Sequence, residues 1–280
     1  MLTLEDILAE KFDFESSDLV TAFDELPLWS APFGLMLLDT VRLRPSLRAL
    51  DVGSGAGFPL LELAQRLGPE ARVVGLDPWR SAADRARLKA RFYRVDNVEL
   101  VEGVAEQMPF PDAHFDLVVS NNGLNNVRDP ERALAECGRV SAPGAQLVFT
   151  ANLPETMQAF YDVFSEVLRA TGHATRVEAL TAHIAAKRPA RVVWEARIRE
   201  AGLTLDRVLE SRFLWRFASG RALLRHGFIR LGFLDAWKAV LPPDDVLPVF
   251  RELEQRLDGV ARAKGDVALG IPYACYDCRR

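Results

Sequence analysis

The sequence predicts an α/β protein built on a doubly wound, Rossmann-like sheet with helical insertions. Two observations predict this class. Between residues 47 and 152, short apolar runs alternate with stretches of helical spacing, which is typical of parallel strands joined by crossover helices. A glycine-rich turn also follows the first apolar run, and sheets of this class bind their ligands beyond the carboxyl ends of the strands.

The predicted strands are short segments with many valine and leucine residues. Five occupy the alternating region, and two more follow nearer the end of the chain. They cover residues 47–53, 71–77, 97–103, 115–121, 145–150, 203–213 and 267–278. Because proline has no backbone N–H to donate, Pro272 restricts the last segment to a sheet edge or to a strand end.

The segments that connect the first five strands have helical spacing. They are residues 58–67, residues 81–95 and the stretch that follows residue 129. The last of these has clear start and stop signals. Asp129 can cap the helix, and Pro130 suits its first position, where no backbone donor is needed. Pro143 and Gly144 are expected to end the connection before the fifth strand.

After residue 152 the strict alternation stops. Residues 153–187 and 219–264 are predicted to be mainly helical, with a further helix between Pro189 and Gly202. Aromatic side chains in this part of the chain either roof an apolar pocket or form the core of these helices, and core packing is the favoured interpretation. These residues are Phe160, Tyr161, Phe164, Trp194, Trp215, Phe217, Phe228, Phe233 and Trp237.

The composition is that of an ordinary globular protein. The 280 residues are 49% hydrophobic and 26% charged, and the net charge is −4. This charge argues against a nucleic-acid partner, because a phosphate backbone requires a broad basic surface. The locally basic stretch at residues 80–94 is interpreted as the solvent-facing side of a helix. No apolar run approaches the ~20 residues of a membrane span, and the acidic N-terminus is unlike a signal peptide, so we expect a cytoplasmic protein.

One segment carries the chemistry, and it reads Asp51-Val52-Gly53-Ser54-Gly55-Ala56-Gly57-Phe58. Glycine tolerates positive φ and has no Cβ to keep a ligand away from the backbone. A dinucleotide-binding turn needs glycines at its first, third and sixth positions. Here glycines stand at the first, third and fifth positions, which disfavours a nicotinamide site. A tight turn that binds no ligand stays open as an alternative.

A carboxylate ends the second predicted strand. Asp77 can accept charge-assisted hydrogen bonds from both ribose hydroxyls of an adenosine. Pro78 and Trp79 follow directly and offer an apolar wall to one face of an adenine ring. The alternative is that Asp77 only caps the helix that begins near Ser81.

Together, the glycine turn and Asp77 resemble the cofactor-binding motifs of class I S-adenosylmethionine-dependent methyltransferases. A third stretch, residues 102–110 with the strand that follows, is similar to the segment that completes the adenine pocket in the ubiquinone/menaquinone-biosynthesis type of this family. The resemblance covers residues 49–152 well and the rest only by the order of elements. It implies S-adenosylmethionine as cofactor and methyl transfer to a small molecule.

The resemblance also implies an architecture. It implies a seven-stranded sheet with an antiparallel last strand, in one methyltransferase domain over residues 1–280. Residues 1–46 would form a helical lid, and residues 47–152 would form the cofactor-binding half. Residues 153–188 and 219–264 would be helical insertions that roof the site of the methyl acceptor.

The residues that the resemblance assigns to the cofactor surround one crevice at the carboxyl ends of the strands. They are Asp51, Gly53, Gly55, Gly57, Asp77, Pro78, Trp79, Val104, Ala105, Glu106 and Asn121. At the position of Val104 the family commonly has Asp, whose carboxylate meets the adenine amino group. Valine cannot accept this hydrogen bond, so adenine recognition is left to backbone groups around Val104 and Ala105, or to Glu106.

The methyl acceptor is expected near residues 120–126, which follow the fourth strand and include four asparagines. Asparagine cannot take up a proton at neutral pH, but it can orient a hydroxyl, a carbonyl or an amine. An equally favoured alternative is a loop whose asparagines satisfy their own backbone. The catalytic residue stays unknown, with Asn122, Asn125, Tyr161 and His173 as candidates. If the aromatic residues of the insertions face inward, the acceptor is largely apolar.

Cys275 and Cys278 form a lone CxxC motif. On a strand their thiols point to opposite sides of the sheet, and no further ligands are evident in the sequence, so we predict no metal site. Two other functions stay open on the sequence alone. One is an S-adenosylmethionine-binding sensor or partner subunit without turnover, and the other is a nicotinamide oxidoreductase. The oligomeric state is also left open.

Overall fold

The computed structural model describes residues 2–24 and 28–280. Their internal contacts divide the chain into two compact units. The sheet unit comprises Phe14–Leu153, Pro189–Ser211 and Tyr273–Arg280. The helical unit comprises Met1–Asp13, Pro154–Arg188 and Arg212–Pro272. The predicted roles of the segments as lid, cofactor-binding half and roofing insertions stay predictions.

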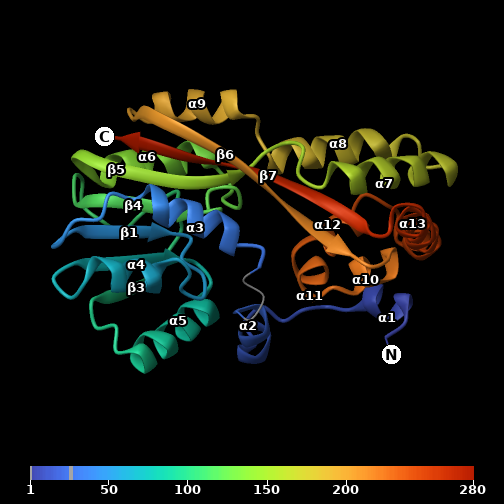
Figure 1. Cartoon of the computed structure of the whole chain (residues 1–280), viewed down its shortest axis with the longest axis horizontal. Coiled ribbons are helices and arrows are strands. Elements are labelled where there is room, and N and C mark those ends of the chain that lie inside the picture. The colour runs from blue at the N-terminus through green and yellow to red at the C-terminus, as the bar shows by residue number, and fades with distance from the viewer. Residues whose placement is uncertain (1, 25–27) are drawn as a thin grey trace. The chain divides into compact units, whose positions relative to one another are not determined.

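A seven-stranded sheet has the strand order β3-β2-β1-β4-β5-β7-β6 (Figure 1). Strands β1 to β5 pair in parallel, and β7 pairs with β5 in the antiparallel direction. The predicted fold class and the antiparallel last strand are thereby confirmed. The strands are β1 (Arg48–Val52), β2 (Arg72–Asp77), β3 (Val98–Glu102), β4 (Phe115–Asn121), β5 (Ser141–Asn152), β6 (Thr204–Phe217) and β7 (Val267–Arg279).

Helices cover both faces of this sheet, which makes it doubly wound as predicted. The helices of the sheet unit are α2 (Ser17–Asp24), α3 (Ala31–Thr40), α4 (Leu60–Leu67), α5 (Arg80–Tyr93), α6 (Pro130–Val140) and α9 (Arg191–Glu200). Successive residues of a strand point to opposite faces. Accordingly, Ala49 of β1 belongs to a core cluster with α3 and α4, whereas its neighbour Leu50 belongs to a cluster with α6 and α9.

Two predicted boundaries are wrong, and turns explain both errors. Helix α4 begins at Leu60, later than predicted, because the glycine turn continues as far as Pro59. Strand β5 begins at Ser141, earlier than predicted. Gly144 adopts a positive φ of 78°, and the pairing of β4 with β5 shifts register in this region, so the strand continues through the proline–glycine pair as an irregularity.

The predicted start of α6 is confirmed. Oδ1 of Asp129 accepts a hydrogen bond from the N–H of Arg132 at 3.0 Å, and Pro130 occupies the first helical position. At the other end, the hydroxyl of Ser141 donates to the carbonyl of Cys137 at 2.6 Å. Both ends of this helix therefore satisfy backbone groups that a helix terminus leaves without partners.

Strand β7 lies between β5 and β6, so of the two predicted placements of Pro272, at a sheet edge or at a strand end, the sheet edge is wrong. The pairing with β5 runs from Tyr273 to Arg279. Pro272 lies directly before this run, where its missing N–H removes no bond to β5. Cys275 and Cys278 belong to core clusters on opposite faces, as predicted, and burial raises the pKa of both thiols.

The helical unit has an aromatic core of its own. Its helices are α1 (Leu4–Ala9), α7 (Gln158–Ala170), α8 (Arg176–Lys187), α10 (Gly220–Arg225), α11 (Gly227–Ile229), the π-helical turn η1 (Arg230–Leu234), α12 (Asp235–Lys238) and α13 (Pro243–Lys264). Phe160 stacks on Trp237 with 4.1 Å between the ring centroids, and Phe164 packs against Phe250. All four are fully buried. For Phe160, Phe164 and Trp237 the favoured interpretation as core is confirmed.

The predicted lid is only partly within the described residues, because residues 25–27 lie outside them. Helix α3 belongs to the sheet layers, since Phe33 and Leu37 are fully buried. None of the helices in the described part of the chain has the length and apolar composition that crossing a bilayer requires.

Candidate functional site

The glycine turn lies at the carboxyl end of β1. Gly53, Gly55 and Gly57 have φ of 79°, 49° and 99°, where residues with a Cβ are strained, so the predicted need for glycine is confirmed. The N–H groups of Gly53 and Ser54 donate to the carbonyl of Leu76 at 2.8 and 3.2 Å. These bonds attach the turn to the end of β2.

The surroundings of the turn differ from one glycine to the next. A Cβ on Gly53 would lie 3.1 Å from Cα of Gly123, so the turn packs closely against the segment after β4. A Cβ on Gly55 would meet no described atom within 4 Å. The backbone at Gly55 therefore borders open space.

Asp77 connects the turn to the start of α5. Its Oδ2 accepts a hydrogen bond from the N–H of Gly55 at 2.8 Å, and its Oδ1 accepts one from the N–H of Trp79 at 2.8 Å. Trp79 is the N-cap residue of α5, so the alternative role in ordering the helix start is present beside the contact to the turn. Each carboxylate oxygen retains capacity for a further donor. Burial raises the pKa of Asp77.

A cavity of about 650 Å³ lies where β1, β2 and β3 end, and we call it the carboxyl-end cavity. It lies within the sheet unit, and both the glycine turn and Asp77 contribute to its wall. The lining residues are Val52, Gly53, Leu76, Asp77, Pro78, Trp79, Gly103, Val104, Ala105, Glu106, Gly123, Asn126, Val127, Arg128, Asp129 and Arg132.

Most of the predicted cofactor residues line this cavity. Those that do are Gly53, Asp77, Pro78, Trp79, Val104, Ala105 and Glu106. Gly55 and Gly57 complete the turn, and Asp51 is fully buried. Asn121 is also buried, and its Oδ1 accepts a hydrogen bond from the Thr150 hydroxyl at 3.1 Å.

Two polar groups near the turn are buried and make no hydrogen bond to any described residue. They are the carboxylate of Asp51, with both oxygens, and the hydroxyl of Ser54. Burial and the charge of Asp77 raise the pKa of Asp51 to about 8, and the backbone N–H of Leu60, which does not meet the geometry of a hydrogen bond to this carboxylate, opposes the rise only in part. A buried polar group without a partner costs free energy, so its presence calls for a ligand, a water or a functional reason.

Glu106 holds the loop that leads into α6. Its Oε1 accepts hydrogen bonds from the N–H groups of Arg128 and Asp129 at 2.7 and 3.2 Å, and its carbonyl accepts one from Nε of Arg132 at 2.8 Å. Val104 is 46% exposed on the cavity wall. The sequence did not predict that Arg128 and Arg132 line the cavity, because the only signal there, at Asp129, was interpreted as a helix start.

Trp79 is held by the segment that contains α2. Its Nε1 donates to the carbonyl of Phe14 at 2.5 Å, and its ring meets those of Phe14 and Phe23 with centroids 5.9 and 5.5 Å apart. Asp24 forms ion pairs with Arg85 and Lys89 of α5, at 2.9 and 2.6 Å. The apolar wall predicted at Trp79 is thus fixed by contacts on its other sides.

The asparagines after β4 mainly bind one another and the backbone. Nδ2 of Asn125 donates to Oδ1 of Asn122 and to Oδ1 of Asn152, the latter at 3.3 Å. Nδ2 of Asn126 donates to the carbonyl of Asn122 at 3.2 Å. These contacts agree with the alternative of a self-satisfying loop, although Oδ1 of Asn125 is buried and lacks a partner within the described residues. A catalytic role for Asn122 or Asn125 stays a prediction.

The other two catalytic candidates belong to the helical unit. The hydroxyl of Tyr161 accepts hydrogen bonds from Nη2 of Arg188 and Nε1 of Trp237, both at 3.1 Å, in a buried cluster. His173 lies 3.1 Å from a carboxylate oxygen of Asp245. These contacts account for both side chains structurally, and catalytic roles for them stay predictions.

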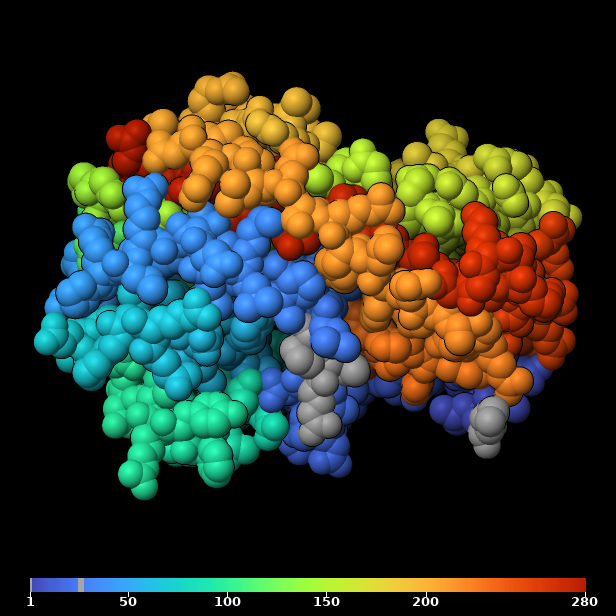
Figure 2. Space-filling view, in the orientation of Figure 1, coloured from blue at the N-terminus to red at the C-terminus, as the bar shows by residue number. Residues whose placement is uncertain are grey.

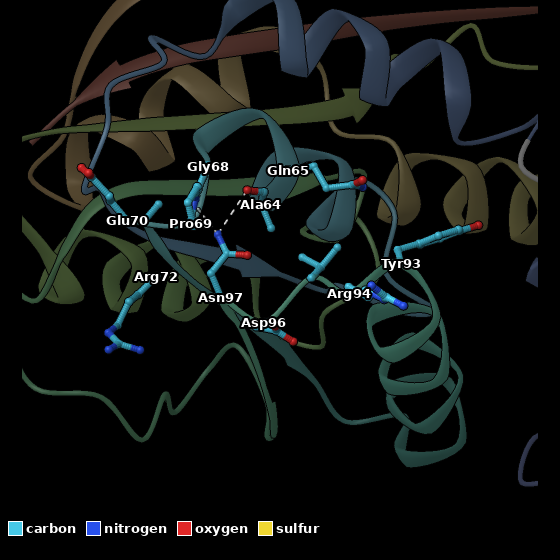
Figure 3. A pocket seen from close by; sticks show the side chains of 12 residues that line it. Ala64, Gln65, Gly68, Pro69, Glu70, Arg72, Tyr93, Arg94, Asp96 and Asn97 are labelled. Carbon is cyan, nitrogen blue, oxygen red and sulfur yellow. Dashed lines mark hydrogen bonds between the residues drawn. The ribbon is translucent and has the colours of Figure 1, made fainter.

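A second hollow, of about 690 Å³, lies where β2 and β3 begin, and we call it the amino-end hollow (Figure 3). Helices α4 and α5 end beside it, at Gly68 and Arg94. Nδ2 of Asn97 donates to the carbonyls of Ala64 and Gly68 at 3.2 and 2.8 Å, which satisfies groups that the end of α4 leaves open. The Asn97 side chain thus completes the end of α4.

Comparison with known proteins shows what the glycine-turn region is similar to. Residues 50–149 match the model of a family described as a methyltransferase domain. A demethylmenaquinone methyltransferase from Listeria welshimeri is 35% identical over 136 residues, which are 47% of this chain and 58% of that protein. A ubiquinone/menaquinone biosynthesis C-methyltransferase from Psychromonas ingrahamii is 36% identical over 132 residues, which are 46% of this chain and 53% of that protein. The chain thus spans little more than half the length of these curated relatives.

Solved structures share the fold over a larger part of the chain. An S-adenosylmethionine-dependent methyltransferase from Aquifex aeolicus has a TM-score of 0.53 at 20% identity, covering 71% of this chain and 93% of that chain. A geranyl diphosphate C-methyltransferase from Streptomyces coelicolor A3(2) has a TM-score of 0.54 at 16% identity, covering 89% of this chain and 76% of that chain. The match of residues 50–149 to the methyltransferase domain model confirms the predicted resemblance to class I S-adenosylmethionine-dependent methyltransferases, and the solved structures show that the fold is shared.

Proposed function

We propose that this protein transfers a methyl group from S-adenosylmethionine to a small, largely apolar metabolite. One observation carries the proposal. The carboxylate of Asp77 binds the glycine turn at Gly55, and Asp77 lines the same cavity as Gly53. The glycine turn and Asp77, which together predict an adenosyl-binding site, are therefore in direct contact at one cavity. A single ligand in this cavity can touch both.

The residues present fit this cofactor. Asp77 has acceptor capacity for ribose hydroxyls, and a carboxylate makes such bonds charge-assisted. Asp51 supplies a buried carboxylate without a protein partner near the turn, which suits a ligand with cationic groups. Open space at Gly55 lets a ligand approach the backbone. Pro78 and Trp79 provide apolar surface for an adenine ring.

The adenine edge is the part of the site where this chain differs from its family. Val104 has no acceptor, so we assign adenine recognition to backbone groups of Val104 and Ala105. Oε1 of Glu106 is already occupied by two backbone donors, which makes this side chain the second choice. Asn121 is assigned an indirect role, since its bond with Thr150 fixes the segment after β4.

The chain's own contribution to the reaction is binding and alignment. When bound, S-adenosylmethionine supplies a methyl group that its sulfonium has already activated. Holding the two reactants in line can contribute several kcal/mol to catalysis without a dedicated base. Asn126 lines the cavity beside the glycine turn, and its amide can orient an acceptor oxygen or nitrogen. We assign no general base.

The apolar nature of the acceptor is proposed from the similar proteins. One relative is named for demethylmenaquinone and one solved structure for geranyl diphosphate, both of which have apolar chains. Binding of S-adenosylmethionine, S-adenosylhomocysteine and NAD, measured by calorimetry, tests the cofactor, and we expect the first two to bind and NAD not to bind. Transfer of a tritiated methyl group into fractions of a metabolite extract tests turnover. Binding without transfer into any fraction would favour the sensor or partner-subunit alternative.

A further inference from the structure

We propose that the outer side of α5 docks this protein on an anionic lipid surface. The α5 face consists of Leu88, Arg91, Phe92, Tyr93 and Arg94. It lies within the sheet unit and shares no residue with the carboxyl-end cavity. The proposal does not depend on methyl transfer.

The α5 face exposes three large apolar or aromatic side chains to solvent. Phe92 is 82% exposed, Tyr93 is 55% exposed and Leu88 is 48% exposed. Leu88 and Phe92 are four residues apart, so they lie on the same side of the helix. The opposite side, with Ala82, Ala83 and Ala86, is buried. In Figure 2 the side chains of this part of the chain form the blue-green protrusion at the lower left.

The same helix is strongly basic in a protein whose net charge is −4. Residues 80–94 contain six arginine or lysine residues and one acidic residue, Asp84. Three of the basic side chains form ion pairs, because Arg85 and Lys89 share Asp24 and Arg87 pairs with Asp84. The other three form no ion pair with the described part of the chain, and they are Arg80, Arg91 and Arg94.

This arrangement matches the boundary between lipid headgroups and acyl chains. A surface helix binds there when apolar side chains enter the boundary and basic side chains meet anionic headgroups. Leu88 and Phe92 supply the apolar side chains, and Arg91 and Arg94 supply the basic side chains. A nucleic acid would instead need a continuous basic surface, and the exposed apolar and aromatic side chains of Leu88, Phe92 and Tyr93 interrupt the basic residues on this side of α5.

Sedimentation with vesicles tests the proposal on the whole protein. We expect at least tenfold more protein bound to vesicles with one third phosphatidylglycerol than to pure phosphatidylcholine vesicles, and release by 0.5 M salt, since the interaction is screened. F92D should reduce binding to the anionic vesicles at least tenfold. V192D is the matched control, because Val192 is also exposed, at 69%, on the arginine-rich helix α9, and it should bind as the unchanged protein does.

A label at the same position gives an independent measurement. The three native cysteines are all buried, so F92C can be labelled selectively with an environment-sensitive dye. Its emission should rise on adding anionic vesicles, and the emission of labelled V192C should not. Equal binding to both kinds of vesicle, an F92D variant that binds normally, or RNA binding that exceeds vesicle binding and is lost in F92D would each overturn the proposal.

Discussion

The sheet unit has a hollow at each end of its strands, and size does not distinguish them. The carboxyl-end cavity measures about 650 Å³ and the amino-end hollow about 690 Å³. Their polar groups differ. At the amino end, Asn97 donates two hydrogen bonds that complete the end of α4. Beside the carboxyl-end cavity, at the glycine turn, Asp51 and Ser54 are buried without a hydrogen-bond partner in the described residues. Between these two hollows, the unsatisfied polar groups and not the volume therefore distinguish the end that carries the glycine turn.

The largest effect is expected from Asp77→Ala. Removing an acceptor of two charge-assisted bonds should weaken S-adenosylhomocysteine binding about a hundredfold, or roughly 3 kcal/mol, as measured by calorimetry. Asn97→Ala at the other end is the control. It should lower the free energy of unfolding by about 1–2 kcal/mol and leave the affinity within twofold. A folded Asp77→Ala variant with unchanged affinity for S-adenosylhomocysteine would contradict the assignment of the cofactor to the carboxyl-end cavity.

Gly55→Val and Gly68→Val make a matched pair. Both glycines have positive φ, of 49° and 81°, and a Cβ on either would meet no described atom within 4 Å. Both variants should therefore lose stability through backbone strain of about 1–3 kcal/mol, and Gly68→Val should lose more because its ψ of 175° lies in a region that only glycine commonly occupies. Only Gly55→Val should weaken cofactor binding, by at least tenfold, because the proposed cofactor occupies the space beside Gly55 and not the space beside Gly68. Equal affinities in the two folded variants would contradict this.

The pH dependence of binding sharpens the role of Asp51. Its pKa is raised to about 8, so it is mainly protonated at neutral pH in the free protein. A cationic cofactor favours the ionised form, and binding below that pKa therefore releases a proton. Affinity for S-adenosylmethionine should rise about tenfold from pH 6 to pH 7 and level off above pH 8. Asp51→Asn cannot ionise and should show a flat profile, so a slope that persists in this variant would assign the proton to another group.

The sequence predicted the fold correctly where the structural signal comes from neighbouring residues, and less well where it comes from distant ones. The strand and helix pattern between residues 47 and 152 was correct because alternation, caps and glycine turns act on neighbouring residues. The boundaries at Leu60 and Ser141 were wrong because the glycine turn and the irregular pairing of β5 overrode local propensity. The sequence left Pro272 at a sheet edge or at a strand end and could not decide between them, because the pairing of β7 with β5 joins segments that are distant in sequence.

The candidate site was predictable to a similar extent. The turn glycines and Asp77 were found because backbone conformation and charge restrict which residues serve there. Arg128 and Arg132 were missed because only the folded loop after β4 brings them to the cavity. The absence of any partner for Asp51 among the described residues also has no sequence signature, since it is a property of the packed core.

Val104→Asp should have the smallest effect, and it is the one gain of affinity. The side chain is 46% exposed on the cavity wall, so a carboxylate can be added there without burying a charge. It would accept a hydrogen bond from the adenine amino group, which the valine cannot do, and should tighten S-adenosylhomocysteine binding about fivefold, or roughly 1 kcal/mol. S-inosylhomocysteine carries an oxygen in place of that amino group and is the control ligand. Adenine and hypoxanthine exchange donor and acceptor character at N1 and at position 6, so backbone groups at Val104 and Ala105 should already make the unchanged protein prefer the adenine form. The variant should prefer it about fivefold more strongly, and an unchanged ratio of the two affinities would show that position 104 does not face the amino group.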